Sequence, residues 1–421
     1  MDKNTPLERV KRYSHSSTTL VSLATKYLLS NDISAQDLSH RLGQLKGPLM
    51  KIGQLLAMVP GLIPPVYEQA LLSLNAQAPP MGPLFVKRRM KGELGPYWED
   101  CFSHFDYHPF AAASIGQVHR AISLDQQLLA CKLQYPNMAG IIEADLKQFN
   151  ILKSLYETRP HGLDLDQFLE EIKSHLYKEI SYHEEAKHIQ IFQNIFSSFD
   201  TVIVPRVISP LSTDRLLTMS YLKGDSLDGI CTMSQSIKNT AAHNLFFAWY
   251  HPFYRHGYLH GDPHAGNYLF SKEGHVSLLD FGCVREFPPS FIKAVYTLYN
   301  GLQNNNKDLL VCAYEGWGFK NLNLKTIDSL TSWAGLFYGP LLEDKSISLA
   351  DRYNTEDIKQ MGREVLTSFK QQGALEIPRE FVLMHRVAVG MGSAFIKLGA
   401  QLNWHRLFET LLDQAGFSRK H

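Results

Sequence analysis

The feature that most constrains this chain is a short stretch near its middle. It reads His-Gly-Asp-Pro-His-Ala-Gly-Asn over residues 260–267, and Asp-Phe-Gly follows at 280–282. An Asp, an Asn five positions later, and an Asp-Phe-Gly after a short strand are the parts that hold ATP and magnesium during phosphoryl transfer. Asp280 and Asn267 offer the hard oxygen ligands that magnesium prefers, and Asp262 is the candidate base or nucleophile-orienting group. The stretch therefore predicts an ATP-using site.

Composition narrows the class of protein. The 421 residues are 44% hydrophobic and 20% charged, which is typical of a globular chain long enough for two or more lobes. A formal net charge of +1 lacks the basic excess of nucleic-acid-binding proteins, so no nucleic-acid partner is expected. The five cysteines are scattered without any CxxC pair, which argues against a zinc site or a disulfide framework. A reducing compartment is expected.

Membrane insertion and cleaved targeting are not predicted. The chain has no uncharged apolar run of about 18 residues, the length needed to span a bilayer. The nearest candidate, residues 381–402, contains Arg386 and Lys397. Residues 1–30 loosely resemble a transit peptide, but Asp2 and Glu8 oppose that interpretation. The expected location is the cytoplasm, with peripheral contact with an inner membrane or an organellar matrix as alternatives.

Breaks and periodicity divide the chain into three parts. Residues 1–95 carry helical periodicity interrupted by paired prolines, residues 96–222 hold short strand-like runs around one helix, and residues 223–421 are mostly helical. Lys223-Gly224 is interpreted as a hinge. This order predicts an α+β, two-lobed protein-kinase-like fold. It would have a small β-rich N-lobe, a helical C-lobe with the catalytic and metal-binding loops, and an N-terminal helical extension.

Lys132 is a candidate phosphate ligand. It lies in an alternating run in which Leu129, Cys131 and Leu133 face one side of a predicted strand and Lys132 the other. A lysine in an apolar strand is costly without an anionic partner, although an edge-strand lysine in solvent is the alternative. Glu179 and Glu185 are two candidate partners on the following helix. Six residues separate them, so they do not share one helical face.

Other candidates are weaker when taken alone. Ala111-Ala112-Ala113-Ser114 precedes the second strand, where kinases place a glycine-rich phosphate loop, and a small-residue turn between strands is the alternative. Lys51 and Gln54 lie three residues apart on one exposed helix face, a pattern also typical of a solvated surface. His260 and His264 alternate with Asp262, but without further clustering they are interpreted as loop supports rather than zinc ligands. Arg386 is interpreted as an anchor of the C-terminal helices.

Together these motifs resemble the UbiB/ADCK (AarF) family of atypical protein-kinase-like ATPases from about residue 40 to 410. The motifs that carry the resemblance are Lys51-Ile52-Gly53-Gln54, Ala111 to His119, Lys132, Glu179 with Glu185, Asp262 to Asn267, and Asp280-Phe281-Gly282. The resemblance implies binding of ATP or ADP with magnesium and support of ubiquinone or related isoprenoid-quinone biosynthesis. It also implies ATPase activity stimulated by lipids and small phenols. An alanine-rich loop in this family alters nucleotide preference and suppresses protein-kinase activity.

The resemblance also assigns roles to single residues. Lys132 would contact the phosphates and pair with Glu185, while Glu179 would face Lys51 and Gln54 of the extension that lies over the protein-substrate entrance. Asp262 would be catalytic, and Asn267 with Asp280 would bind magnesium. The remaining nucleotide contacts would come from Ala111, Ala112, Ala113, Ser114, Tyr221 and Leu222.

Three features depart from the family pattern. Ser181 replaces the second acid of the ExD motif that begins at Glu179, and Ser220 replaces a common hinge acid. The membrane-spanning segments of many members are not recognised, so membrane contact is expected to be peripheral.

The expected partners are a nucleotide, quinone-pathway proteins and isoprenoid lipids. The alternatives are a small-molecule phosphotransferase of the aminoglycoside- or choline-kinase type and a nucleotide-gated scaffold without catalysis.

Overall fold

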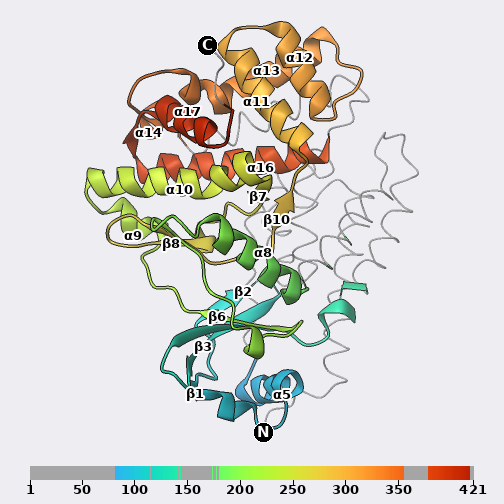
Figure 1. The fold of residues 1–421 in the computed structure, drawn as a ribbon, viewed down its shortest axis with the longest axis vertical. Coiled ribbons are helices and arrows are strands. Elements are labelled where there is room, and N and C mark those ends of the chain that lie inside the picture. Colours follow the sequence, from blue (N-terminus) through green and yellow to red (C-terminus); the bar gives the residue numbers. More distant parts are fainter. Residues whose placement is uncertain are drawn as a thin grey trace, which may run out of the picture. The chain divides into compact units, whose positions relative to one another are not determined.

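The computed structural model describes residues 81–113, 115–140, 142–143, 173, 177, 180–354 and 378–417. The predicted contacts of Lys51, Gln54, Ser114 and Glu179 lie outside the described residues. The chain forms two compact units (Figure 1). Unit 1 holds the described residues up to Glu184 together with Ile208–Ser220, and unit 2 holds Glu185–Val207 and the chain from Tyr221 onward.

Unit 1 is built on a five-stranded antiparallel sheet in the order β1-β3-β4-β6, with β2 paired to β3. The strands are β1 (Phe102–Phe105), β2 (Ala111–Ala113), β3 (Gly116–Ser123), β4 (Leu128–Gln134) and β6 (Leu216–Ser220), with the 3-10 turn η2 (Ser209–Leu211) before β6. β4 is a central strand, because β3 and β6 pair with its two edges. Its buried position explains the apolar run that marks it in the sequence.

The core of unit 1 lies between this sheet and the helix α5 (Pro83–Leu94), followed by the 3-10 turn η1 (Trp98–Cys101). Pro83 begins α5 and Gly95, at φ 89°, ends it, which is the usual placement of these two residue types. Val86 and Met90 of α5 and Trp98 of η1 are buried in one cluster with alternate residues of the strands. This alternation fixes which face of β4 meets the core.

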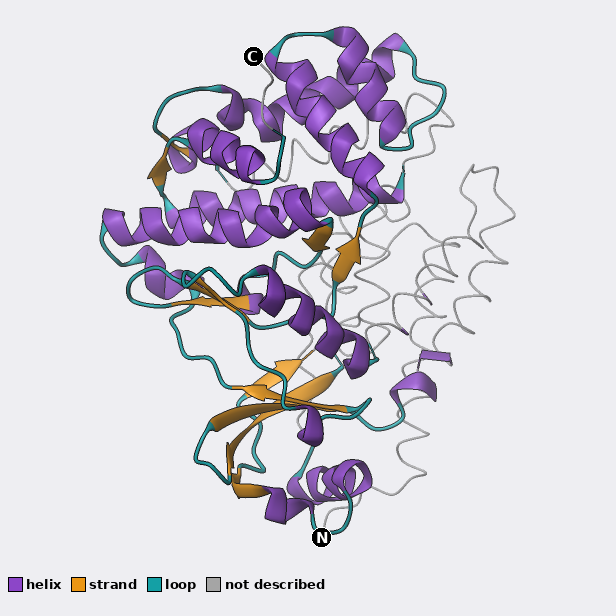
Figure 2. Cartoon of the chain, viewed as in Figure 1, coloured by secondary structure: helices purple, strands orange, loops and turns teal. Residues whose placement is uncertain are grey.

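Unit 2 is mainly helical, as Figure 2 shows by its purple ribbons. Its long helices are α10 (Gln235–His256), α11 (Pro289–Gln303), α12 (Lys307–Gly316), α13 (Leu324–Leu342), α16 (Arg379–Leu398) and α17 (Trp404–Gln414), with the shorter α9 (Leu227–Cys231) and α14 (Leu349–Arg352). The helix α8 (Tyr182–Ile195) begins in unit 1 and continues into unit 2. α10 packs against α16 and α17 through Phe246, which contacts Phe395, Trp404 and Phe408.

The strands of unit 2 are short. β8 (Tyr268–Phe270) and β9 (Val276–Leu278) confirm the two predicted strands, and β5 (Val202–Ile203) pairs with β9 in parallel. β7 (Tyr258–His260) pairs with β10 (Val284–Glu286), and β11 (Ile347–Ser348) with β12 (Gln401–Leu402). A strand-rich part followed by a mostly helical part confirms the predicted α+β class.

Candidate active site

Residues 260–267, called the catalytic loop below because Asp262 is the candidate catalytic residue, are positioned by the pairing of β7 with β10. α10 ends at Gly257, whose φ of 79° turns the chain into β7. His260 is paired with Val284, and the backbone N–H of Gly261 donates to the carbonyl of Cys283 at 2.6 Å. Residues 22 and 24 positions apart in the sequence therefore meet at one loop.

His260 joins the two halves of the motif. Its Nδ1 accepts a hydrogen bond from the backbone N–H of Asp262 at 3.2 Å, so Nε2 carries the proton and donates to the carbonyl of Asp280 at 2.6 Å. Trp249 Nε1 in turn donates to the carbonyl of His260 at 3.0 Å. Burial lowers the pKa of His260, which keeps the ring neutral and suited to this double role. His264 also supports the loop, because its Nδ1 accepts from the N–H of Gly266.

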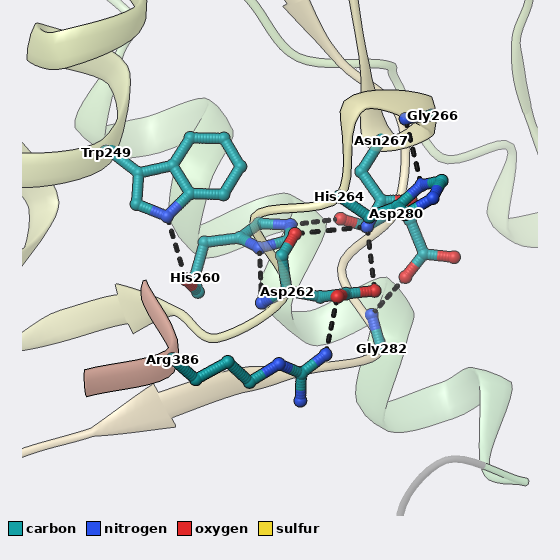
Figure 3. A network of polar contacts seen from close by, with 9 residues as sticks. All are labelled: Trp249, His260, Asp262, His264, Gly266, Asn267, Asp280, Gly282 and Arg386. Carbon is teal, nitrogen blue, oxygen red and sulfur yellow. Dashed lines mark hydrogen bonds and ion pairs between the residues drawn. The ribbon is translucent and has the colours of Figure 1, made fainter. Parts of the chain in front are cut away.

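Asp262 is held through both carboxylate oxygens (Figure 3). Oδ2 accepts from Asn267 Nδ2 at 2.9 Å, and Oδ1 accepts from the guanidinium of Arg386 at 2.6 Å. The two side chains of the ion pair are 26% and 23% exposed, so substrate or water can reach Asp262. Both donors make charge-assisted or polar bonds to the carboxylate and fix the direction in which it points.

Asn267 and Asp280 present oxygen atoms suited to magnesium. Asn267 Nδ2 donates to both the carbonyl and the carboxylate of Asp262, so the amide oxygen Oδ1 is turned the other way. The backbone N–H of Leu279 donates to the carbonyl of Asn267, which sets Asn267 beside the end of β9. Asp280 Oδ1 accepts from the N–H of Gly282 at 3.0 Å. One carboxylate and one amide oxygen fit a cation that keeps several of its own waters.

Glu185 lies against the Asp-Phe-Gly segment. Its carboxylate is 3% exposed and accepts from the backbone N–H of Phe281 at 3.3 Å. His188, one turn along α8, bonds the carbonyl of Phe281 at 3.1 Å. The ring of Phe281 is fully buried and packs edge-on against Phe192 of the same helix. α8 therefore holds the Asp-Phe-Gly segment in place through hydrogen bonds to the backbone of Phe281 and through packing against the Phe281 ring.

α16 packs on the catalytic loop through residues spaced along one of its faces. The ion pair of Arg386 with Asp262 lies between two close contacts on the same helix. A Cβ built on Gly390 would overlap the ring of Pro263, and a Cβ on Gly261 would lie 3.0 Å from Leu383 Cδ1. Only glycine allows the helix and the loop to approach this closely at Gly390.

The interpretation of Arg386 as an anchor of the C-terminal helices missed its partner. Arg386 reaches the side chain of Asp262, 124 positions earlier, so it belongs to the site. The signal was present in the sequence, because an arginine in an otherwise apolar helix needs an anionic partner in the same way as Lys132. The distance in sequence concealed which partner it has.

α16 is also the one helix in the described part of the chain whose length and composition would allow it to cross a membrane. The sequence alone predicted no such helix. Its contacts within unit 2 explain the apolar composition differently. Besides the contacts with the catalytic loop, Lys397 pairs with Asp228 at 2.5 Å, and the Sγ of Cys231 donates to the carbonyl of Lys397. A helix pinned at several positions to its own unit behaves as a core helix.

In unit 1, Lys132 is not an edge-strand lysine in solvent. Its side chain is 5% exposed on the central strand β4, opposite Val118 of β3 and Leu217 of β6. The ammonium lies 5.4 Å from the ring centroid of Tyr182, a cation–π contact. The predicted pairing of Lys132 with Glu185 joins residues of the two units and stays a prediction.

The three alanines form a strand rather than the small-residue turn that was the alternative interpretation. Ala111–Ala113 form the strand β2, and Ala113 is paired with Gly116, so only positions 114 and 115 connect the two strands. Alanines are usually depleted in strands, but pairing with β3 overrides that preference. Gly116 is required where it stands, because a Cβ there would lie 2.5 Å from the carbonyl oxygen of Leu133 and 2.7 Å from the Tyr182 hydroxyl.

Comparison with known proteins agrees with this geometry. Residues 73–313 match the ABC1 atypical kinase-like domain. The Saccharomyces cerevisiae protein named atypical kinase COQ8, mitochondrial, is 27% identical over 394 residues, covering 92% of this chain and 77% of the yeast protein. The Caenorhabditis elegans atypical kinase coq-8, mitochondrial, is 25% identical over 395 residues, which cover 92% of this chain and only 52% of the worm protein.

A solved structure supports the fold. The Rv3197–erythromycin complex from Mycobacterium tuberculosis contains a protein 24% identical to this chain, with a TM-score of 0.64. The alignment covers 96% of this chain and 99% of that one. At this identity the likeness bears on architecture alone. Together with the matched domain, it confirms the predicted kinase-like fold.

Proposed function

This chain belongs to the ABC1 atypical kinase-like family, and on that premise we propose that it binds ATP or ADP with magnesium and hydrolyses ATP. The observation that carries the proposal is the arrangement of Asp262, Asn267 and Asp280 around one loop. His260, Arg386 and backbone hydrogen bonds hold these three oxygen-bearing side chains in place. Phosphoryl transfer depends mainly on such positioning.

Each residue then has a defined task. Asn267 Oδ1 and the carboxylate of Asp280 would hold magnesium, which when bound offsets the charge that develops on the phosphates. Lys132 would contact the α and β phosphates, supported by Glu185, and Ala111–Ser114, Tyr221 and Leu222 would line the nucleotide. We retain residues 1–95, 96–222 and 223–421 as the proposed extension, N-lobe and C-lobe.

The state of Asp262 favours hydrolysis over transfer to a protein hydroxyl. Its two oxygens already accept from a guanidinium and an amide, which fixes the carboxylate in one orientation. It is suited to orient a water molecule by a hydrogen bond. The proposed contact of Glu179 with Lys51 and Gln54, which belongs to the family pattern, would act in the same direction by limiting access of a protein substrate.

The biological setting follows from the relatives. We propose a supporting role in ubiquinone or related isoprenoid-quinone biosynthesis, through ATP hydrolysis coupled to the handling of lipids or protein complexes. The yeast and worm relatives are mitochondrial by name, which supports an organellar setting in preference to the cytoplasm expected from composition. Quinone-pathway proteins and isoprenoid lipids are the proposed partners, with peripheral membrane contact.

The test is phosphate release from MgATP by the purified chain, with and without anionic liposomes and a phenolic quinone-precursor analogue. We expect turnover that these additions stimulate and that Asp280→Asn and Asn267→Ala abolish. Equal turnover in both variants would refute the magnesium assignment. Phosphorus NMR separates the alternatives, because a phosphorylated small acceptor would indicate a phosphotransferase, and nucleotide binding without turnover would indicate a scaffold.

A further inference from the structure

The inner face of β3 carries two polar side chains where the sheet meets its hydrophobic core. Gln117 and His119 are 1% and 0% exposed. They lie opposite Leu133 and Cys131 of β4, which are both members of the core cluster. This is the face away from Lys132, which is paired with the intervening Val118. Alternation predicts apolar residues at both positions.

The two side chains form a relay between backbone groups far apart in the sequence. The N–H of Met81 donates to Gln117 Oε1 at 2.6 Å, so the amide nitrogen of Gln117 faces His119 Nε2, 2.8 Å away. An amide nitrogen can only donate, and His119 Nε2 must therefore accept. The proton of the ring lies on Nδ1, which donates to the carbonyl of Asp106 at 2.8 Å. Every side-chain group in the relay has a partner of the right kind.

The ends of the relay indicate what it connects. Met81 directly precedes Gly82, the N-cap of α5, and follows the paired prolines at positions 79 and 80. Gln117 is paired with Ala112 of the alanine strand, one residue after the Gly116 that closes the hairpin. One glutamine therefore contacts the residue that precedes the N-cap of α5 and lies at the base of the β2–β3 hairpin.

Packing alone does not require polar residues here. Apolar side chains of similar shape would fill the two positions without any need for partners, whereas a buried amide and imidazole are costly unless every group is bonded. His119 also stacks on Phe105 with ring centroids 5.4 Å apart, a contact that an aromatic hydrocarbon could make equally well. What the polar pair adds is a rigid connection of Met81 to the hairpin.

We propose that Gln117 and His119 are positioning residues that couple the chain at Met81 to the β2–β3 hairpin. A nucleotide bound at Ala111–Ala113 then changes the environment of Met81. This coupling rests on the nucleotide binding proposed above.

The chain contains 11 methionines, so selective ¹⁵N-methionine labelling gives a simple spectrum in which the backbone amide of Met81 is assigned by its loss in Met81→Leu. We expect addition of MgADP to shift the Met81 resonance in the wild type and to leave it in place in Gln117→Leu. The dissociation constant for MgADP should change at least about fivefold in Gln117→Leu, the lower end of typical coupling between sites. Gln127→Leu, in the exposed β3–β4 turn, is the matched control and should behave as the wild type.

The outcomes separate the two proposals. Wild-type protein that binds MgADP with no change at Met81, or Gln117→Leu with unchanged affinity and an unchanged Met81 response, overturns the relay alone. Wild-type protein that binds no nucleotide removes the proposed function and the relay with it. If Gln117→Leu does not melt cooperatively, His119→Phe replaces it, because it keeps the stack on Phe105 and removes the bond that orients the Gln117 amide toward Met81. A full Met81 response in folded His119→Phe also overturns the coupling.

Discussion

Each unit of this chain contains a buried neutral histidine with both ring nitrogens engaged, and the two differ in what they hold. His260 in unit 2 joins two backbone groups directly, the N–H of Asp262 and the carbonyl of Asp280. His119 in unit 1 reaches one backbone carbonyl and depends on the side chain of Gln117 for its other bond. A direct tie fixes the catalytic loop without intermediaries, whereas the relay can be interrupted at one side chain.

The largest expected effect is that of His260→Phe. The ring volume is kept, but both bonds to the loop backbone are lost at once, and we expect the free energy of unfolding to fall by about 2–4 kcal/mol. MgATP turnover should disappear, since Asp262 and Asp280 lose their common support. His119→Phe, measured by the same urea titration and phosphate-release assay, should cost only about 1–2 kcal/mol and retain turnover. Equal losses in the two variants would remove the distinction between tie and relay.

Gly390→Ala tests the catalytic loop from outside, without changing either histidine. The new Cβ would lie 2.8 Å from Pro263 Cβ and overlap the rest of a rigid ring, so the loop or α16 must move. We expect a loss of about 1–3 kcal/mol in unfolding free energy, the usual cost of overpacking, and a fall in kcat larger than any change in KM. Gly392→Ala is the matched control on the same helix, because nothing lies within 4 Å of its Cβ. Comparable damage from both variants would point to helix propensity instead.

Arg386→Gln removes the side-chain contact to Asp262 and leaves the backbone ties of His260 in place. We expect a fall in kcat of about tenfold, because the carboxylate loses a charge-assisted bond that orients it. Stability should change by less than about 1 kcal/mol, since the pair is partly exposed. Steady-state kinetics and urea unfolding together measure both quantities. Unchanged kcat would show that His260 alone orients the loop.

A third histidine, His251, extends the comparison because its role is in packing and not in holding a backbone group in place. His251 is 6% exposed within an aromatic cluster, and its buried Nδ1 has no hydrogen-bond partner within the described ranges. Burial lowers its pKa to about 4, and the nearby His256 and Arg255 add to the effect. The unfolded chain therefore takes up a proton first as the pH falls below about 6.5, and stability is lost between there and pH 4.

The expected loss attributable to His251 is about 2 kcal/mol between pH 7 and pH 5, at about 1.4 kcal/mol per pH unit below 6.5. His251→Phe should reduce the pH dependence of urea unfolding by that amount and leave stability at pH 7 unchanged or higher. Turnover at pH 7 should not change, because the ring contacts that hold His251 are with Phe196, Phe199, Phe247 and His256, outside the catalytic loop. An unaltered pH profile in His251→Phe would assign the acid sensitivity to other groups.

The sequence was most informative where chemistry and local spacing coincide. Asp262 and Asn267 lie five positions apart and meet in the structure, and the strand that carries Lys132 has the predicted alternation. Local periodicity reports such features because they depend on neighbours in the chain. The predicted strands at 268–270 and 275–279 were found for the same reason.

What the sequence did not indicate depends on distant partners. Arg386 finds Asp262 only after folding, and the alanines of β2 are extended only because β3 pairs with them. β7 and β10 are three residues each, too short to give a periodic signal, yet their pairing brings His260 to Asp280. The roles of Gln117 and His119 were also not foreseen, because a polar residue on a strand is usually interpreted as facing solvent.

The connectivity of the two units has a consequence for the order in which the chain can mature on a ribosome. The chain passes from unit 1 to unit 2 after Glu184, returns for Ile208–Ser220, and leaves again at Tyr221. The sheet of unit 1 therefore waits for β6 to emerge, and β5 waits for β9, more than 70 residues later. No single cut in the chain releases either unit whole. Expressing one unit alone therefore requires joining segments that are not adjacent in the sequence.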